Sequence, residues 1–216
     1  MLDDWGSNSP DYFHDTQCND RSCYKSQLLK EQADEDIDAA FIYLKARNDV
    51  KTSNSDATDF HIGVMGISYG GAVTVFTNRR DHGQKAVVPF SPGAQQFADE
   101  TCAPNDASCG TAFQKDLVSA ASNAKKAAYY LQAKWDYDTR ATIDLAYAHA
   151  YGSNDPKHSR AWNAAIFLYK DPCVRADGTS RPCTDDDYQS IHAGFFKDVE
   201  KWGPTVLDFL KRNNVK

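Results

Sequence analysis

The sequence predicts an α/β fold in which a mostly parallel sheet carries helices on both faces. Short apolar runs alternate with longer amphipathic stretches along most of the chain, as strands and crossover helices do. Several of these runs are mostly apolar, which is typical of strands buried within a parallel sheet. The 216 residues contain no internal repeat and no low-complexity tract. We therefore expect a single domain over residues 1–216.

Each element is predicted from its local pattern. Residues 1–25 are polar and aperiodic, and we expect an irregular N-terminal segment there. From about residue 26 to 47, apolar residues recur at steps of three and four, which predicts an amphipathic helix. Strands are predicted over 59–65, 85–93, 127–133 and 164–169. Further helices are predicted over 72–80, 111–126, 139–151 and, near the C-terminus, around 199–210.

Composition and charge exclude several classes of protein. An apolar fraction of 41% is ordinary for a soluble globular domain. The formal charge of −6 and the lack of a basic stripe argue against a nucleic-acid partner. No apolar run approaches the length of a membrane span, so we expect no membrane partner. The stretch from Met1 to Trp5 is acidic where a signal peptide would be basic and then apolar.

The cysteines indicate an oxidising compartment. Six cysteines fall into three close pairs: Cys18 and Cys23, Cys102 and Cys109, Cys173 and Cys183. Each pair lies in a polar, turn-rich segment, which favours three local disulfides and a secreted or otherwise extracytoplasmic protein. Zinc is the competing interpretation, but the spacings differ, none is C-x-x-C, and no histidine lies beside a pair at ligand spacing. We expect no metal. If the chain is secreted, its leader has been removed or lies outside this sequence.

Residues 66–71 read Gly-Ile-Ser-Tyr-Gly-Gly and contain the pattern G-x-S-x-G. The pattern lies between a predicted strand and a predicted helix, which is the setting of a nucleophile elbow. The small residues at 66, 70 and 71 are expected to let the backbone bend tightly. In such a turn the Ser68 hydroxyl is exposed above the sheet edge, and the Tyr69 backbone amide faces a developing oxyanion. The alternative is a glycine-rich turn with a passive serine.

A nucleophilic serine needs a base within hydrogen-bond reach, and the base needs a partner that fixes its tautomer. Ser68, Asp136 and His192 each follow a predicted strand, in the order nucleophile, acid, histidine. Because the carboxyl ends of parallel strands meet at one edge, we expect all three in post-strand loops at that edge. Asp138 is the alternative acid, although it is the better candidate for the cap of the next helix.

Five other histidines compete with His192 for the role of base: His14, His61, His82, His149 and His158. His61 lies inside the strand that leads to Ser68, and His149 lies on a predicted helix. The others precede the motif, follow the elbow helix directly, or lie in a polar loop. We favour His192 because it alone follows the last predicted strand and precedes the last predicted helix.

Three stretches of the chain resemble the α/β-hydrolase superfamily, and most of all its dienelactone hydrolase-related branch: residues 63–71, 131–137 and 192–196. In that family the corresponding stretches carry the nucleophile, the acid and the histidine. The resemblance covers roughly residues 30 to 214 and implies an α/β-hydrolase-like fold. Members of this branch often use cysteine as the nucleophile, whereas Ser68 makes this chain similar to the esterase-like relatives.

The chain departs from the superfamily pattern at its N-terminus. The first 25 residues contain no strand-like run, and no His-Gly or Gly-Gly loop that would carry a second oxyanion donor. By this comparison about half of the sheet would be absent, and the strand before Ser68, normally central, would become an edge. An exposed parallel edge is a pairing site. We therefore expect either a C-terminal portion of a longer hydrolase or a homodimer formed through that edge.

The leading hypothesis is a serine hydrolase that cleaves small-molecule carboxylic esters through an acyl-enzyme. Ser68 would attack, His192 would transfer the proton, Asp136 would orient His192, and the Tyr69 amide would hold the oxyanion. This chemistry requires no metal or organic cofactor. A peptidase or an acyltransferase remains open, because the elbow does not define the acceptor.

Two alternatives belong to other classes of protein. One is a non-catalytic binding module with an α/β-hydrolase-like fold, which the short N-terminus favours. The other is a redox or metal protein built on the cysteines, which their unequal spacings disfavour. The sequence does not rank ester classes, because the aromatic residues near the site line either an acyl pocket or the core: Tyr69, Trp135, Tyr137, Phe195 and Phe196.

Overall fold

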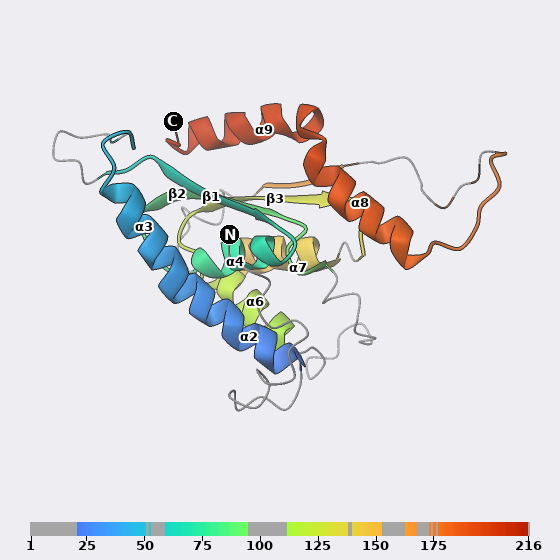
Figure 1. Cartoon of the computed structure of the whole chain (residues 1–216), viewed down its shortest axis with the longest axis horizontal. Helices are drawn as coiled ribbons and strands as arrows, with labels where there is room; N and C mark the ends of the chain where they lie inside the picture. Colours follow the sequence, from blue (N-terminus) through green and yellow to red (C-terminus); the bar gives the residue numbers. More distant parts are fainter. Residues whose placement is uncertain are drawn as a thin grey trace.

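A parallel sheet forms the centre of the fold, which is described from a computed structural model of the chain (Figure 1). Its strands are β1 (Ile62–Ile67), β2 (Gln84–Phe90), β3 (Ala127–Ala133) and β4 (Asn163–Phe167). They are hydrogen-bonded in the order β1-β2-β3-β4, and each neighbouring pair is parallel. The predicted α/β class is therefore confirmed, and β3 has the predicted bounds.

The structure describes residues 21–50, 52, 59–94, 112–137, 140–152, 163–167, 173, 175 and 177–215. The predictions about Cys18, Cys102, Cys109 and Asp138, and most of the predicted N-terminal segment, fall outside these residues.

One long helix precedes the sheet. It consists of α2 (Arg21–Glu31), a π-helical turn η1 (Gln32–Asp36) and α3 (Ile37–Lys45). The prediction of an irregular segment is wrong for residues 21–25, which include Cys23 and form the start of α2. The start of α2 is not evident from the sequence, because its residues are polar and show no apolar pattern. The helix is stabilised instead by its packing against α6 and α4.

The remaining helices cover the sheet. They are α4 (Tyr69–Thr77), α6 (Ala112–Ser122), α7 (Arg140–Gly152), α8 (Asp185–Lys197) and α9 (Val199–Arg212). Figure 1 shows α9 on one side of the sheet, with α4, α6 and α7 on the other. Val88 and Phe90 of β2 belong to one core with Trp202 of α9, whereas Val87 and Tyr130 belong to the opposite core. Helices thus lie on both faces, as predicted.

β1 lies at one end of the strand order, so the strand that leads to Ser68 is an edge within the described part of the chain. β2 and β3 are buried along most of their length, whereas only Ile62 is buried in β1. The Met65 side chain of β1 is 46% exposed. The sheet is therefore incomplete on the β1 side among the described residues, as the sequence comparison leads us to expect.

Cys173 and Cys183 form a disulfide in the segment between β4 and α8. Their Cα atoms are 5.0 Å apart, a usual separation for this bond. One of the three predicted pairs is thus confirmed. The bond is compatible with an extracytoplasmic location. In the described part of the chain, no helix has both the length and the apolar character needed to cross a bilayer.

Candidate active site

Ser68 joins β1 to α4 in a sharp turn. Its backbone has φ 58° and ψ −119°, a conformation that costs a non-glycine residue about 1–3 kcal/mol. Backbone hydrogen bonds hold the turn. The Ser68 N–H donates to Phe90 O at 2.9 Å, and Ser68 O accepts from the Ala72 N–H at 3.0 Å and from the Gly93 N–H at 3.4 Å. This strand–turn–helix geometry is that of a nucleophile elbow.

Two of the three glycines beside Ser68 are needed for close backbone packing. A Cβ at Gly66 would overlap the backbone carbonyl of Gly70, and a Cβ at Gly71 would lie 2.6 Å from Phe90 O. At Gly70 a Cβ would meet nothing within 4 Å. The expectation that the backbone needs small residues here therefore holds for Gly66 and Gly71. At Gly70 a larger side chain would meet no steric obstacle near its Cβ.

Tyr69 is the first residue of α4. The N–H groups of the first helical turn point toward the N-terminal end and carry the positive end of the helix dipole. The Tyr69 ring stacks on Phe113 with centroids 6.4 Å apart and packs against the core. The main chain of Tyr69, rather than its ring, is therefore the group that the turn presents next to Ser68.

Asp136 and His192 form a hydrogen-bonded pair beyond the carboxyl end of β3. His192 Nδ1 lies 2.8 Å from Asp136 Oδ1 and 2.9 Å from Oδ2. The carboxylate also accepts from the Tyr137 N–H at 2.8 Å. The side chain of Asp136 is fully buried, and that of His192 is 14% exposed. With Nδ1 on the carboxylate, Nε2 is the ring nitrogen that remains to take a proton.

His192 lies inside α8 and not in a post-strand loop, so the predicted setting of this residue is wrong. The helix is held by Ile191 and Phe195, which are one turn apart and pack into the core beneath it. Their burial directs the neighbouring His192 toward Asp136. The run of three aspartates at residues 185–187 hides the helix in the sequence, because it contains no apolar residue.

The N-terminus of α8 is anchored by charge. Both terminal nitrogens of Arg181 donate to the Asp187 carboxylate at 2.6 Å, and the Thr184 N–H donates to the same carboxylate at 2.8 Å. The Arg181 guanidinium, and then the Thr184 N–H, hold the pKa of Asp187 below its usual range. This cluster sets where the helix that carries His192 begins.

Ser68 and Asp136 lie at the same edge of the sheet, because each follows the carboxyl end of a parallel strand. Ile67 pairs with Phe90, and Phe90 pairs with Leu131. The strands that lead to Ser68 and Asp136 are therefore two strand spacings apart, about 10 Å. No hydrogen bond found among the described residues joins the Ser68 hydroxyl to His192. The structure thus joins Asp136 to His192 and places Ser68 at their edge of the sheet.

The other described histidines lie away from this pair. His61 precedes β1 and His82 precedes β2, so both lie at the opposite, amino-terminal edge. His82 Nδ1 is 2.5 Å from Asp38 Oδ1. His149 is fully buried on α7, with Nδ1 3.2 Å from the Tyr130 hydroxyl. The other two candidates, His14 and His158, fall in parts of the chain that the structure does not describe.

Gln132 and Thr142 belong to the same hydrogen-bond network, although neither is a candidate from the serine, aspartate and histidine pattern. Gln132 Nε2 donates to Asp136 Oδ2 at 2.8 Å. Thr142 Oγ1, on α7, donates to Gln132 Oε1. Both residues are fully buried. The available signal was a polar residue inside an apolar strand, four positions before Asp136.

One of the five aromatic candidates contacts the pair. Phe195 is fully buried and Phe196 packs against the same core, so the core interpretation applies to both. The Tyr137 ring meets the His192 ring at 5.7 Å in an edge-on arrangement. Trp135, in the turn between β3 and Asp136, is 36% exposed. Tyr137 is therefore the aromatic residue in contact with the pair.

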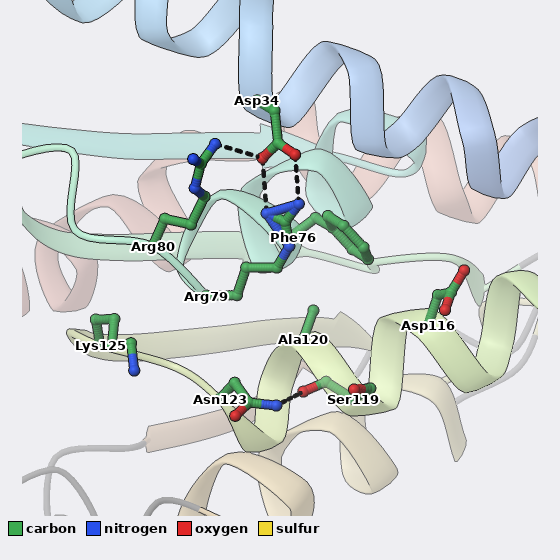
Figure 2. Close-up of a pocket in the computed structure, with 9 residues that line it drawn as sticks. All are labelled: Asp34, Phe76, Arg79, Arg80, Asp116, Ser119, Ala120, Asn123 and Lys125. Atoms are coloured by element: carbon green, nitrogen blue, oxygen red, sulfur yellow. Dashed lines mark hydrogen bonds and ion pairs between the residues drawn. The ribbon is translucent and has the colours of Figure 1, made fainter.

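A cavity of about 520 Å³ lies elsewhere, against η1, α4 and α6 (Figure 2). Within it Arg79 binds Asp34 with two hydrogen bonds at 2.6 and 2.7 Å, and Arg80 lies 3.0 Å from the same carboxylate. Arg79 and Arg80 follow the last turn of α4, and Lys125 precedes β3. The cavity is thus at the amino-terminal edge of the sheet, opposite Ser68, and both of its arginines are paired with Asp34.

One group of described residues brings three possible metal-ligand atoms together: Cys173, Cys183 and Asp187. The two sulfurs are bonded to each other, so neither is a thiolate that could bind a cation. Asp187 is in turn paired with Arg181. The group therefore fits a structural disulfide beside an ion pair rather than a metal centre.

No family model matches the chain, and no curated protein matches it. Among solved structures the chain is similar to an esterase from Pyrococcus furiosus, with 17% sequence identity and a TM-score of 0.46. The match covers 82% of this chain and 60% of the esterase chain, so the chain spans about three fifths of that protein. A likeness of this size assigns no activity, and the geometry at the sheet edge has to carry any functional argument.

Proposed function

We propose that this chain is a serine hydrolase that cleaves a carboxylic ester through an acyl-enzyme, with Ser68, His192 and Asp136 as its triad. The observation that carries the proposal is the combination, at one sheet edge, of a strained serine and a buried Asp–His pair. Strained backbone gathers at functional sites. A buried carboxylate is costly unless it is paired, and here its partner is a histidine that keeps some exposure.

In this mechanism Ser68 Oγ attacks the ester carbonyl carbon while its proton passes to His192 Nε2. Asp136 holds the Nδ1–H and stabilises the imidazolium that forms. The Tyr69 N–H donates to the oxyanion of the tetrahedral intermediate. The intermediate then expels the alcohol, which takes its proton from His192. Water, deprotonated by His192, finally attacks the acyl-serine and releases the acid and the free Ser68 hydroxyl.

A small-molecule ester is the proposed substrate. The resemblance of residues 63–71, 131–137 and 192–196 to dienelactone hydrolase-like enzymes supports this choice. The serine at 68 favours their esterase-like relatives. Extracytoplasmic location is proposed with it, on the strength of the Cys173–Cys183 bond.

A non-catalytic binding module is the second candidate. It is favoured by one observation, which is that no hydrogen bond among the described residues joins the Ser68 hydroxyl to His192. Catalytic hydrogen bonds are often long in the absence of substrate and tighten in the complex. The two candidates therefore have to be separated by a reaction and not by geometry.

A fluorophosphonate probe separates them, because it labels only a serine that is activated as a nucleophile. We expect a single covalent adduct on the intact protein, mapped to Ser68 by peptide mass spectrometry. The Ser68→Ala variant should remain folded and unlabelled. A folded sample with no adduct at Ser68, and no turnover of simple aryl esters, would contradict the hydrolase and leave the binding module.

A further inference from the structure

We infer that Gln132 and Thr142 are positioning residues of the proposed site: together they hold the Asp136 carboxylate, and through it the His192 imidazole, in a single orientation. This inference rests on the proposed hydrolase function. It concerns side chains from two elements, β3 and α7: Gln132 lies within the stretch 131–137 that carries Asp136, and Thr142 lies outside all three motif stretches.

The Asp136 carboxylate is held from three directions. Oδ1 accepts from the Tyr137 N–H at 2.8 Å, and Oδ2 accepts from Gln132 Nε2 at 2.8 Å. His192 Nδ1 lies within 2.9 Å of both oxygens. The Tyr137 donor is the adjacent main chain, so it moves with Asp136 and fixes only the local turn. Gln132 is therefore the side chain that ties the carboxylate to the rigid sheet.

The Thr142 hydroxyl holds the accepting end of the Gln132 amide and so supports the orientation in which the donating end faces the carboxylate. A carboxylate accepts hydrogen bonds and donates none, whereas an amide has one accepting and one donating end. With the Thr142 hydroxyl donating to Oε1, Nε2 is turned toward Asp136 Oδ2. A flipped amide would set Oε1 against the carboxylate and lose that hydrogen bond. The Thr142 hydroxyl thus acts on Asp136 through Gln132.

Burial makes this orientation matter. Gln132 and Thr142 are fully buried, and Asp136 is 4% exposed, so water cannot easily replace a lost donor. A buried acceptor left without a donor is costly, and the carboxylate relieves the cost by rotating away. Rotation would break the contact of both oxygens with His192 Nδ1. The imidazole would then lose the tautomer and direction that proton transfer from Ser68 needs.

The test compares Thr142→Val with Thr142→Ser. The valine matches threonine in size and removes only the hydroxyl, whereas the serine retains it. We expect Thr142→Val to lower kcat on an aryl ester by roughly threefold to tenfold with KM unchanged, as for the loss of one hydrogen bond in the transition state. Thr142→Ser should restore the rate. Ala146→Gly on the same helix is the control for simple destabilisation, and it should lower the melting temperature without changing kcat.

Gln132→Leu should lower kcat by about tenfold or more, because it removes the donor itself. In that background Thr142→Val should have no further effect on kcat, since its route to Asp136 is already gone. Independent, additive losses from the two substitutions would contradict the inference. So would an effect on KM or on melting temperature alone.

A second readout does not need turnover. The Nδ1 proton of His192, held by a carboxylate, should give a low-field proton resonance that exchanges slowly with water. Thr142→Val and Gln132→Leu should broaden or remove it, and Thr142→Ser should keep it. If the wild type neither labels nor turns over, the proposed hydrolase fails while this resonance still tests the network. An unchanged resonance in both variants would overturn the positioning role.

Discussion

At the scale of the residue, Ser68 is held in its unfavourable backbone conformation by its neighbours. Its N–H and C=O are both used, by Phe90 and Ala72. The turn is also confined by the close approach of Gly66 to the Gly70 carbonyl and of Gly71 to Phe90 O. These contacts offset the roughly 1–3 kcal/mol of strain. The turn is therefore as sensitive to the glycines beside the serine as to the serine itself.

The two glycines that end the motif should respond differently to alanine. Gly71→Ala places a Cβ against Phe90 O, and we expect a loss of about 1–3 kcal/mol in the free energy of unfolding together with loss of probe labelling at Ser68. Gly70→Ala is the matched control, because it has open space and gains up to about 1 kcal/mol of helix propensity. Urea unfolding measures both. Equal destabilisation by the two substitutions would contradict the elbow geometry.

The sequence predicts which residues lie at this site better than it predicts the hydrogen bonds that hold them. The sequence around Ser68 indicates a sharp turn, because a strand and a helix meet there at small residues, and the structure places two of these, Gly66 and Gly71, against the backbone of α4 and β2. The choice of Asp136 and His192 agrees with the pair that the structure brings together. Gln132 and Thr142 could not be identified in the same way, since their roles depend on a contact between β3 and α7 that no local pattern encodes.

At the scale of the element, α8 is the helix on which the geometry of the site depends most. It carries His192 and begins at a cluster formed by Arg181, Thr184 and Asp187. Eight residues of moderate apolarity separate that cluster from Phe196, and the sequence predicts a loop there. Tertiary burial of Ile191 and Phe195 creates the helix that propensity alone does not indicate.

The Asp187 cluster should make the docking of α8 dependent on pH. The pKa of Asp187 is lowered in the folded protein, by Arg181 first, and is about 3.9 in an unfolded chain. Its stabilising contribution is therefore complete above about pH 4 and is lost as the pH falls toward the lower, folded-state value. We expect the urea midpoints of wild type and Asp187→Asn to differ at pH 7, and the difference to begin to shrink as the pH falls below about 4.

Asp208→Asn is the control for that experiment. Asp208 also pairs with an arginine, Arg212 at 3.0 Å, but its side chain is 67% exposed. Exposed pairs contribute little, so this variant should follow the wild type at every pH. A difference between wild type and Asp187→Asn that does not shrink as the pH is lowered below about 4 would show that the carboxylate's charge is not what anchors α8.

The Cys173–Cys183 bond should stabilise the segment that leads into α8. The two cysteines are ten residues apart in sequence, and closing a loop of that length is worth about 2–3 kcal/mol in the unfolded chain. Replacing both with serine should lower the free energy of unfolding by that amount under non-reducing conditions. Adding a reductant should lower the wild type by more than the variant, because the variant no longer has this bond to lose. Equal stability of the two proteins without reductant would contradict this role.

At the scale of the whole molecule, the alternation of short apolar runs with amphipathic stretches predicts a parallel sheet, because successive parallel strands are joined by crossover helices. It also predicts both layers, since β2 and β3 bury residues on each face. The limits of the sheet are harder to predict. They depend on which strand lies beside which, and only the structure shows β1 next to β2 with no further strand beyond it among the described residues.

An edge at β1 matters for assembly. Two copies related by a two-fold axis can pair the same strand only antiparallel, and antiparallel pairing is the more stable kind of ladder. Within the described part of the chain, β1 has no strand on one side; Gly63 and Met65 are exposed and no residue after Ile62 is buried. The exposed Ile42 and Tyr43 of α3 add apolar surface from the helix that precedes this strand. We therefore expect a second copy of this chain to pair along β1.

Sedimentation equilibrium tests this expectation directly, because the monomer mass is 24.0 kDa. We expect the wild type to approach twice that mass as its concentration rises. Met65→Lys should shift the equilibrium to the monomer, since a lysine on a strand edge opposes pairing. Ile143→Lys on α7 is the matched control, because that side chain is also about half exposed, at 49%, and lies away from β1. A wild type that stays monomeric at high concentration, or an equal shift by both lysines, would contradict edge pairing through β1.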